Sequence, residues 1–488
     1  MYMKKKTCIL LALLIVLLTA CGTGETSETM QETDASTQAV ETETERIYPN
    51  VEGVNYGGAE VRTIHFNPGP DNGYSAGFYF QLDVEEESGD VLMDSIYIRN
   101  RNVEENLNID LTFTGEVNAN NMMNTIRAAT MGGTGEFDLI VPYLREYPNL
   151  VNEDLVLDLN TFDVLDFTSP WWDSKSADEL MLQNKLYGVV SDWTIADKMS
   201  NFCIFFSKQL VDDFGIENPY QLVLDGKWTL DYMLEKAQMV ASDLNGNGER
   251  DLEDRFGILS DRDLSYALFH AGGWKLAENG TDGIPQITIH GEQEITALQR
   301  IYEIFTQDMF LSRYFSGQMT MQEMAQIFAN GQVLYFAHIP EALQELRQSD
   351  NDFGIIPFPK YDSTQQEYIT PLTHWAATLT SIPTVTTDAD RAAVVLNILA
   401  AESCYELMPS LYEVVLDVKY TRDEESAQML DIIFDTRTYD IGNICNFGGL
   451  ADLVLQLQNN PNIVSSLTSK KEMAQADLEK FIEGISQE

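Results

Sequence analysis

The stretch SDLNGNGERDLED, residues 242–254, carries oxygen-bearing side chains at alternating positions, which is the arrangement of a calcium-binding loop. Calcium takes about six to eight oxygen ligands, and Gly248 allows the sharp turn that wraps them around one point. A structural Ca2+ is therefore expected here, and the alternative is a surface turn rich in Asn, Asp and Gly that holds no metal. The expected ligands are Asp243, Asn245, Asn247, Glu249 through its backbone carbonyl, and Asp254.

The segments beside this loop favour a structural site over a calcium sensor. Residues 229–241 have the apolar spacing of a helix, and residues 255–259, RFGIL, are typical of a strand. A sensor works by reorienting two helices, and only one helix is expected here. The predicted ion would therefore hold the fold together without switching it.

Motifs of catalysis are absent from the sequence. It contains no H-E-x-x-H, no G-x-S-x-G, no P-loop and no dinucleotide fingerprint. Its 5 histidines are scattered, and with 77 acidic residues chance pairs of carboxylates are unavoidable. We therefore expect a protein that is not an enzyme.

The N-terminus has the pattern of an export signal. Three lysines, at residues 4–6, precede an apolar run at residues 8–18, which is shorter than the about 20 residues of a membrane-spanning helix. The following LTAC resembles the bacterial lipobox, in which Cys21 would carry lipid; the alternative is an ordinary secretory signal with a chance cysteine. We expect residues 1–21 to be the signal peptide and the protein to be lipid-anchored at the extracellular face of the cell membrane.

Composition separates a tether from a folded body. Residues 22–47 are rich in Thr and Glu and poor in large apolar side chains, so they are predicted to be a disordered tether. The net charge of −47 makes nucleic acid and anionic lipid poor partners. No second apolar run of membrane length is expected in the body, so the lipid anchor would be its only contact with the membrane.

The first part of the body alternates strands with helices. This order favours an open, parallel α/β sheet. Ligands bind beyond the carboxyl ends of the strands in such sheets, which places Tyr143, just after the third strand, at the expected site. The strands are expected at residues 61–66, 109–113 and 137–142, and the helices at residues 90–107 and 118–131.

Five longer stretches follow one another in a specific order and spacing. Two of them are GKWTLDYMLEKAQMV, residues 226–240, and FANGQVLYFAHIPEALQELR, residues 328–347. Together with residues 136–162, 184–216 and 352–360 they resemble the extracellular solute-binding proteins of bacterial ABC importers, the type that carries sugars. The resemblance is spread over most of the chain after the tether.

This resemblance implies an α/β fold of two lobes joined by a hinge, the type II fold of periplasmic binding proteins. Lobe one is expected to contain residues 48–165 and 331–371, and lobe two residues 166–330 and 372–488. The cleft between the lobes would close around a ligand by bending at the hinge. The ligand would then pass to the permease subunits of an ABC transporter.

Aromatic residues point to a carbohydrate, because the C–H faces of a sugar pack on aromatic rings while its hydroxyls need polar partners. Three tryptophans in loops are favoured by their positions as cleft residues, and four polar residues are candidate partners for the hydroxyls of the sugar. For each of them the alternative is ordinary structural packing. The expected ligand-binding residues are Trp193, Trp274, Trp375, Tyr143, Asp192, His338 and His374.

These features together predict a lipid-anchored solute-binding subunit that captures an extracellular sugar or oligosaccharide for import. Two alternatives remain open, a secreted glycan-acting hydrolase and a ligand-binding adaptor of a membrane sensor. A neighbouring permease gene would favour the importer, and turnover of a glycan would favour the hydrolase. Three cysteines of the body, Cys203, Cys404 and Cys445, leave one disulfide or free thiols as alternatives.

Overall fold

The computed structural model describes residues 46–69, 77–289, 291–346, 351–416 and 424–486. The chain divides into two units, Met1–Glu52 and Gly53–Glu488, and every element described below belongs to the second unit. The predicted signal peptide with Cys21, and the predicted tether up to residue 45, lie outside the described residues.

The first sheet has three parallel strands in the order β2-β1-β3. A helix follows each of the first two strands, as the alternating pattern predicted. The strands are β1 (Ala59–Phe66), β2 (Ile109–Glu116) and β3 (Leu139–Val141), and the helices are α1 (Val91–Leu107) and α2 (Ala119–Gly132).

Local capping explains where these helices begin and end. The carboxylate of Asp90 accepts hydrogen bonds from the backbone N–H groups of Leu92 and Met93 at the start of α1, and Asn118 caps α2 in the same way. After α2, Gly133 takes a left-handed conformation with φ 58°, which suits glycine. These caps satisfy backbone groups that a helix leaves unpaired at its ends, so the predicted boundaries are confirmed to within a few residues.

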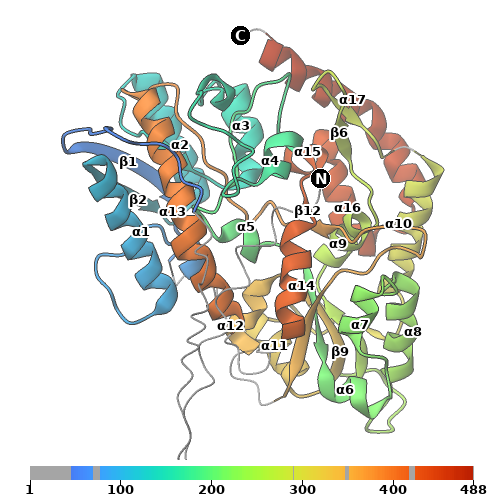
Figure 1. Ribbon diagram of the computed structural model, residues 1–488. Coiled ribbons are helices and arrows are strands. Elements are labelled where there is room, and N and C mark those ends of the chain that lie inside the picture. Colours follow the sequence, from blue (N-terminus) through green and yellow to red (C-terminus); the bar gives the residue numbers. More distant parts are fainter. Residues whose placement is uncertain (1–45, 70–76, 290, 347–350, 417–423, 487–488) are drawn as a thin grey trace, which may run out of the picture. The chain divides into compact units, whose positions relative to one another are not determined.

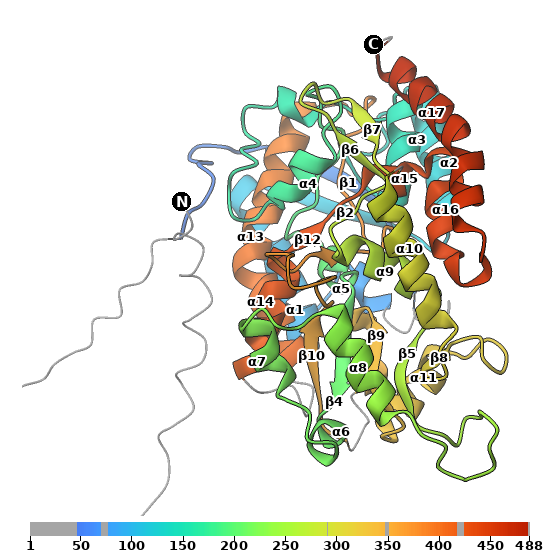
Figure 2. The same cartoon turned by 90° about the vertical axis from the view of Figure 1, so that its right-hand side faces the viewer.

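The second sheet has five strands in the order β10-β4-β9-β5-β8. β4 is antiparallel to both of its neighbours, whereas β5 is parallel to β8 and β9. The helix α8 (Leu230–Val240) packs on β5, and Figure 2 shows it lying across these strands. The strands are β4 (Cys203–Ser207), β5 (Phe256–Ser260), β8 (Phe310–Ser312), β9 (Val333–His338) and β10 (Phe353–Pro357).

The pairing of β9 and β10 corrects the predicted lobe boundaries. We expected residues 331–371 in lobe one, but both strands pair with β4, where Cys203 lies opposite His338 on one side and Pro357 on the other. β4 and β10 are buried along their whole length, and only the last residue of β9 is partly exposed. The prediction is wrong for these strands because an apolar sequence fits the middle of any buried sheet and does not specify which one. Their pairing partners are distant in the chain, so local sequence does not reveal them.

A long helix, α13 (Ala389–Leu416), corrects the boundary a second time. It was expected in lobe two, but it lies along α1 beside the first sheet (Figure 1). Among the described residues it is the one helix long and apolar enough to cross a membrane, a property that the sequence was not expected to have. Within its most apolar window 72% of the residues are buried, so α13 serves here as a packed helix of the core.

Three stretches carry the chain between the sheets and pair with one another. Residues 140–146 run antiparallel to residues 372–381, through bridges that join Ile140 to Ser381 and Tyr143 to Thr378. Residues 189–201 join them through bridges such as that between Val189 and Thr380. This pairing brings the end of the first sheet next to the chain that returns from the second sheet.

The remaining elements surround these sheets. α14 packs on β10, and α17 packs on the short helix η5 (Phe447–Gly449). In the part of the chain that the structure describes, no disulfide joins Cys203, Cys404 or Cys445. The remaining α-helices are α3 (Tyr147–Asn152), α4 (Ser174–Glu179), α5 (Ala196–Met199), α6 (Lys208–Asp213), α7 (Pro219–Leu224), α9 (Asp263–Ala271), α10 (Glu292–Phe305), α11 (Met321–Ala329), α12 (Leu343–Leu346), α14 (Glu424–Asp435), α15 (Ile441–Cys445), α16 (Leu450–Leu455) and α17 (Ile463–Ser486). The remaining strands are β6 (Ala277–Asn279), β7 (Pro285–Ile287), β11 (Thr370–Pro371) and β12 (Arg437–Thr438).

Candidate functional site

A small pocket, with room for about one water molecule, lies where the stretches that follow β1 and β9 meet α5. Both strands end there at their carboxyl ends, which is where α/β sheets bind ligands. A second, smaller pocket shares Tyr79 and Phe80 with the first. The lining of the first pocket is Tyr79, Phe80, Ala196, Met199, Ser200, Ile339, Glu341 and Ala376.

Trp375 stands directly before Ala376 of this pocket, and 49% of it is exposed to solvent. It is the one tryptophan among the described residues that is largely exposed. Keeping half of a large aromatic side chain in water forgoes part of the free energy of burial, and the exposed ring is accessible for packing on a sugar. Trp375 therefore has the character that the sequence predicted for a sugar-packing residue.

An arginine connects Trp375 with the first sheet. The guanidinium carbon of Arg145 lies 4.4 Å from the centre of the Trp375 ring and 5.1 Å from that of Tyr143. Tyr143 itself is buried and packs on Phe66 and Phe80, with ring centres 4.2 and 5.8 Å away. The structure thus places two predicted site residues close to one arginine that the prediction missed.

Backbone pairing holds this cluster in place. The N–H of Arg145 donates to the carbonyl of His374 over 3.3 Å, and the N–H of Leu144 donates to Ala377 over 2.9 Å. The His374 ring is buried 5.4 Å from Trp375 and accepts a hydrogen bond at Nδ1 from the Asn443 amide over 2.7 Å. Burial and the nearby Arg145 charge lower the pKa of His374 to about 3, so its ring is neutral at neutral pH.

The other predicted aromatic residues lie elsewhere. Trp193 is fully buried, and its backbone carbonyl accepts a hydrogen bond from Arg99 over 3.1 Å. Trp274 is partly exposed and packs on Phe269 and Tyr361, outside the cluster around Trp375. In this structure the Trp193 ring therefore offers no surface to a solute, and Trp274 is not brought to the pocket.

His338 lies at the edge of the site. It ends β9 and directly precedes Ile339, which lines the first pocket. Its Nδ1 is buried and has no hydrogen-bond partner among the residues that the structure describes. The position next to the pocket agrees with the predicted role, and contact with a ligand stays a prediction.

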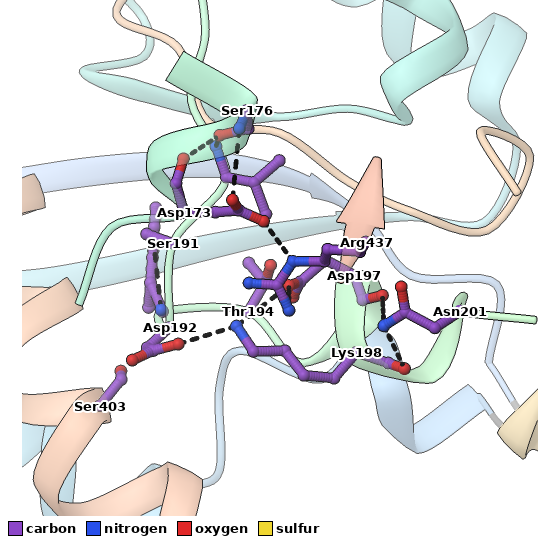
Figure 3. A network of polar contacts seen from close by, with 12 residues as sticks. Asp173, Ser176, Ser191, Asp192, Thr194, Asp197, Lys198, Asn201, Ser403 and Arg437 are labelled. Carbon is purple, nitrogen blue, oxygen red and sulfur yellow. Dashed lines mark hydrogen bonds and ion pairs between the residues drawn. The ribbon is translucent and has the colours of Figure 1, made fainter. Parts of the chain in front are cut away.

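Asp192 belongs to a buried network of charges behind the pocket (Figure 3). Lys198 lies 2.7 Å from Asp192 and 3.0 Å from Asp197. Arg437 contacts Asp173 directly and lies 3.5 Å from Asp197. The carboxylate of Asp192 is thus occupied by an internal ion pair, and the network fixes α5, whose Ala196 and Met199 line the pocket.

The pKa shifts in the network follow from burial and pairing. Burial lowers the pKa of Lys198, but the adjacent carboxylates outweigh it and the net shift is upward. Burial raises the pKa of Asp173, but Arg437, Tyr439 and Lys198 together outweigh burial, so the net shift is downward. For Asp197 the effect of burial exceeds the opposing effects of Lys198 and Arg437, so its pKa is raised. Asp173 and Lys198 are therefore held in their charged forms.

The predicted calcium loop turns its side chains toward its own backbone. The carboxylate of Asp243 accepts hydrogen bonds from the N–H groups of Gly246 and Gly248 over 2.7 and 2.8 Å, and Asp254 accepts one from Asp251 over 3.0 Å. The helix before the loop and the strand after it are confirmed as α8 and β5. In the part of the chain that the structure describes, no three acidic, His or Cys side chains gather as a metal site. The donors fit calcium in type, and binding of the ion by this loop stays a prediction.

Comparison with known proteins agrees with this geometry. Residues 101–403 match the family model described as bacterial extracellular solute-binding protein. No curated protein matches the chain.

Several solved structures share the fold at low sequence identity. One is the ABC substrate-binding protein Lmo0181 from Listeria monocytogenes in complex with cycloalternan, with TM-score 0.52, 13% identity, and 88% of this chain and 98% of that chain covered. A second is the GacH receptor of Streptomyces glaucescens GLA.O, solved unliganded and with acarbose and an acarbose homolog. Its TM-score is 0.53 at 14% identity, with 88% of this chain and 99% of that chain covered. A third is the cyclic α-maltosyl-1,6-maltose binding protein from Arthrobacter globiformis. Its TM-score is 0.58 at 12% identity, with 87% of this chain and 100% of that chain covered. These likenesses confirm the predicted two-lobe α/β fold.

Proposed function

This chain belongs to the bacterial extracellular solute-binding proteins, and on that premise we propose that it captures a sugar or oligosaccharide outside the cell for import by an ABC transporter. The observation that carries the proposal is the half-exposed ring of Trp375 beside a pocket lined by Tyr79 and Phe80. Aromatic rings at a site of this kind pack on the C–H faces of sugars. The solute would be bound and released unchanged, so the protein would act as a carrier and not as an enzyme.

Proteins of the same fold support the carbohydrate class. The solved structures named above hold cycloalternan or acarbose, or bind cyclic α-maltosyl-1,6-maltose. Their identities to this chain, 12–14%, carry over no individual ligand. What supports the same class here is the aromatic lining of the pocket in this chain.

The proposed location and partners follow from the N-terminus and the charge. A lipid on Cys21 would anchor the protein, and residues 22–47 would let the folded body reach the solute and the permease subunits. The net charge of −47 argues against anionic lipid surfaces and nucleic acid as partners. A structural Ca2+ in the loop at residues 242–254 remains part of the proposal, because the loop offers carboxylate and amide oxygens.

Calorimetric titration of the full-length chain against neutral and charged oligosaccharides tests the function. The variant Trp375→Ala is expected to weaken binding by about 10- to 100-fold, as expected for an aromatic anchor of a binding site. Tyr314→Ala is the matched control, because Tyr314 is also an exposed aromatic residue, at 38%, and lies outside the pocket. Binding of no saccharide, together with binding of another class of solute, would refute the carbohydrate assignment. Release of cleaved sugar would refute the carrier role.

A further inference from the structure

Arg145 carries a positive charge at the candidate site of a strongly acidic protein. Its side chain is 24% exposed, and its guanidinium group stacks on Trp375 and Tyr143. Stacking on aromatic rings orients the planar group and fixes the direction of its N–H bonds.

The hydrogen bonds of Arg145 leave its terminal nitrogens available. Nε donates to Glu146 over 3.2 Å, and the other carboxylate oxygen of Glu146 accepts from the Asn149 amide over 2.8 Å. The two terminal nitrogens of Arg145, Nη1 and Nη2, donate to no residue that the structure describes. A guanidinium with both terminal nitrogens open presents a fork that fits a carboxylate through two parallel hydrogen bonds.

Among the described residues Glu146 offsets the charge of Arg145 through Nε, and the terminal nitrogens of Arg145 stay open to a ligand. His374 is neutral, because burial and the charge of Arg145 itself lower its pKa to about 3. Glu146 is buried and already bonded to Arg145 and Asn149. Lys198, the other nearby cation behind the pocket, is committed to Asp192 and Asp197. Arg145 is therefore the cation that an anionic ligand would meet at Trp375, whereas Glu341 places a carboxylate in the lining of the first pocket.

From this geometry we propose that the solute is a saccharide that carries a carboxylate, such as a uronic acid unit, and that Arg145 is the residue that selects it. The inference rests on the proposed carbohydrate function and narrows its substrate class. The sugar ring packs on the exposed part of Trp375 while the carboxylate meets Nη1 and Nη2 of Arg145. A carboxylate fits better than a phosphate dianion, because its two oxygens match the two open terminal nitrogens and the whole chain, at −47, repels a second negative charge.

The test measures affinity by calorimetry with the full-length chain in mild detergent. The probes are uronate di- and trisaccharides from pectin and alginate, each beside a neutral sugar of the same size, together with a sugar phosphate. Arg145→Gln is expected to weaken uronate binding by about 10- to 100-fold and neutral sugar binding by less than about 3-fold. Arg145→Lys keeps the charge without the fork and is expected to fall between wild type and Arg145→Gln.

Arg300→Gln is the matched control. Arg300 is 25% exposed, stacks on Tyr361 at 4.7 Å and pairs with Asp231, so it reproduces the setting of Arg145 away from the pocket. This variant is expected to leave every affinity unchanged. Added salt is expected to weaken uronate binding and to leave neutral sugars unaffected.

The outcomes separate the two claims. Neutral sugars that bind as well as uronates, or uronate binding that survives Arg145→Gln, would overturn the role of Arg145 and leave the carbohydrate function intact. Binding of the sugar phosphate alone would overturn the choice of carboxylate. Binding of no saccharide at all would overturn the proposed function and this inference with it.

Discussion

The ammonium group of Lys198 lies 2.7 Å from the carboxylate of Asp192, and next to this pair Arg437 bridges Asp173 and Asp197. The five side chains are buried or nearly buried (Figure 3). They fix the position of α5, and α5 contributes Ala196 and Met199 to one wall of the first pocket. The network therefore links the stability of the fold to the shape of the site.

Replacing the bridging cation should be costly for folding. Arg437→Met is expected to lower the free energy of unfolding by about 3–5 kcal/mol, because it leaves Asp173 and Asp197 buried with less positive charge beside them. Chemical denaturation followed by tryptophan fluorescence measures this change. Lys227→Met, which removes an exposed ion pair with Asp225, is the control and should have a much smaller effect. Equal effects of the two variants would contradict the assigned role of the network.

Two buried histidines should make stability depend on pH. Burial lowers the pKa of His65 to about 4, and burial with the charge of Arg145 lowers that of His374 to about 3. An unfolded histidine titrates near 6.5, so below that pH the unfolded state binds more protons and stability falls. The loss is about 1.4 kcal/mol per pH unit for each histidine until its folded pKa is reached.

Comparison of His374→Asn with wild type isolates one of these contributions. The free energy of unfolding of the variant is expected to fall less steeply between about pH 6.5 and about pH 4 than that of wild type. Denaturation curves recorded across this range give both slopes. Identical slopes would show that His374 is not held neutral in the folded protein.

The loop at residues 242–254 offers a test of metal binding. If it holds Ca2+, adding calcium should raise the melting temperature relative to chelator, because a ligand of the folded state stabilises it. Asp243→Asn should remove the difference, whereas Glu472→Gln, at an exposed carboxylate of α17, should retain it. A melting temperature that is the same with calcium and with chelator would contradict the predicted Ca2+ site.

The predicted anchor can be tested by fractionating cells. Cys21→Ser is expected to move the protein from the membrane fraction to the soluble exported fraction, because the lipid would be its only hold on the membrane. Cys404→Ser, at a cysteine of the folded body, should leave the protein at the membrane. Membrane retention of Cys21→Ser would contradict the lipobox assignment.

Local sequence signals accounted for much of the fold. Residues 61–142 contain strands and helices whose apolar periods differ clearly, and their helices carry capping residues such as Asp90 and Asn118. The same signals predicted the helix and strand that flank the loop at residues 242–254. These features depend on residues close together in the chain, so they can be inferred before the tertiary structure is known.

The candidate site was only partly predictable. Tyr143 was expected from its place after a parallel strand, and Trp375 from its loop. Trp193 was also expected in a cleft loop, yet the structure buries its side chain completely. Arg145 follows Tyr143 by two residues, and nothing in its local sequence shows that Trp375 would lie over its guanidinium group.

The sequence by itself therefore determined the α/β class, the first sheet with its helices, the acidic character of the chain and the family. Only the tertiary structure decided that β9 and β10 belong to the second sheet, that α13 is buried along α1, and that Arg145 stacks on Trp375. The physical reason is that helix periods and caps are set by neighbouring residues, whereas strand partners, burial and ring contacts are set by residues far apart in the chain.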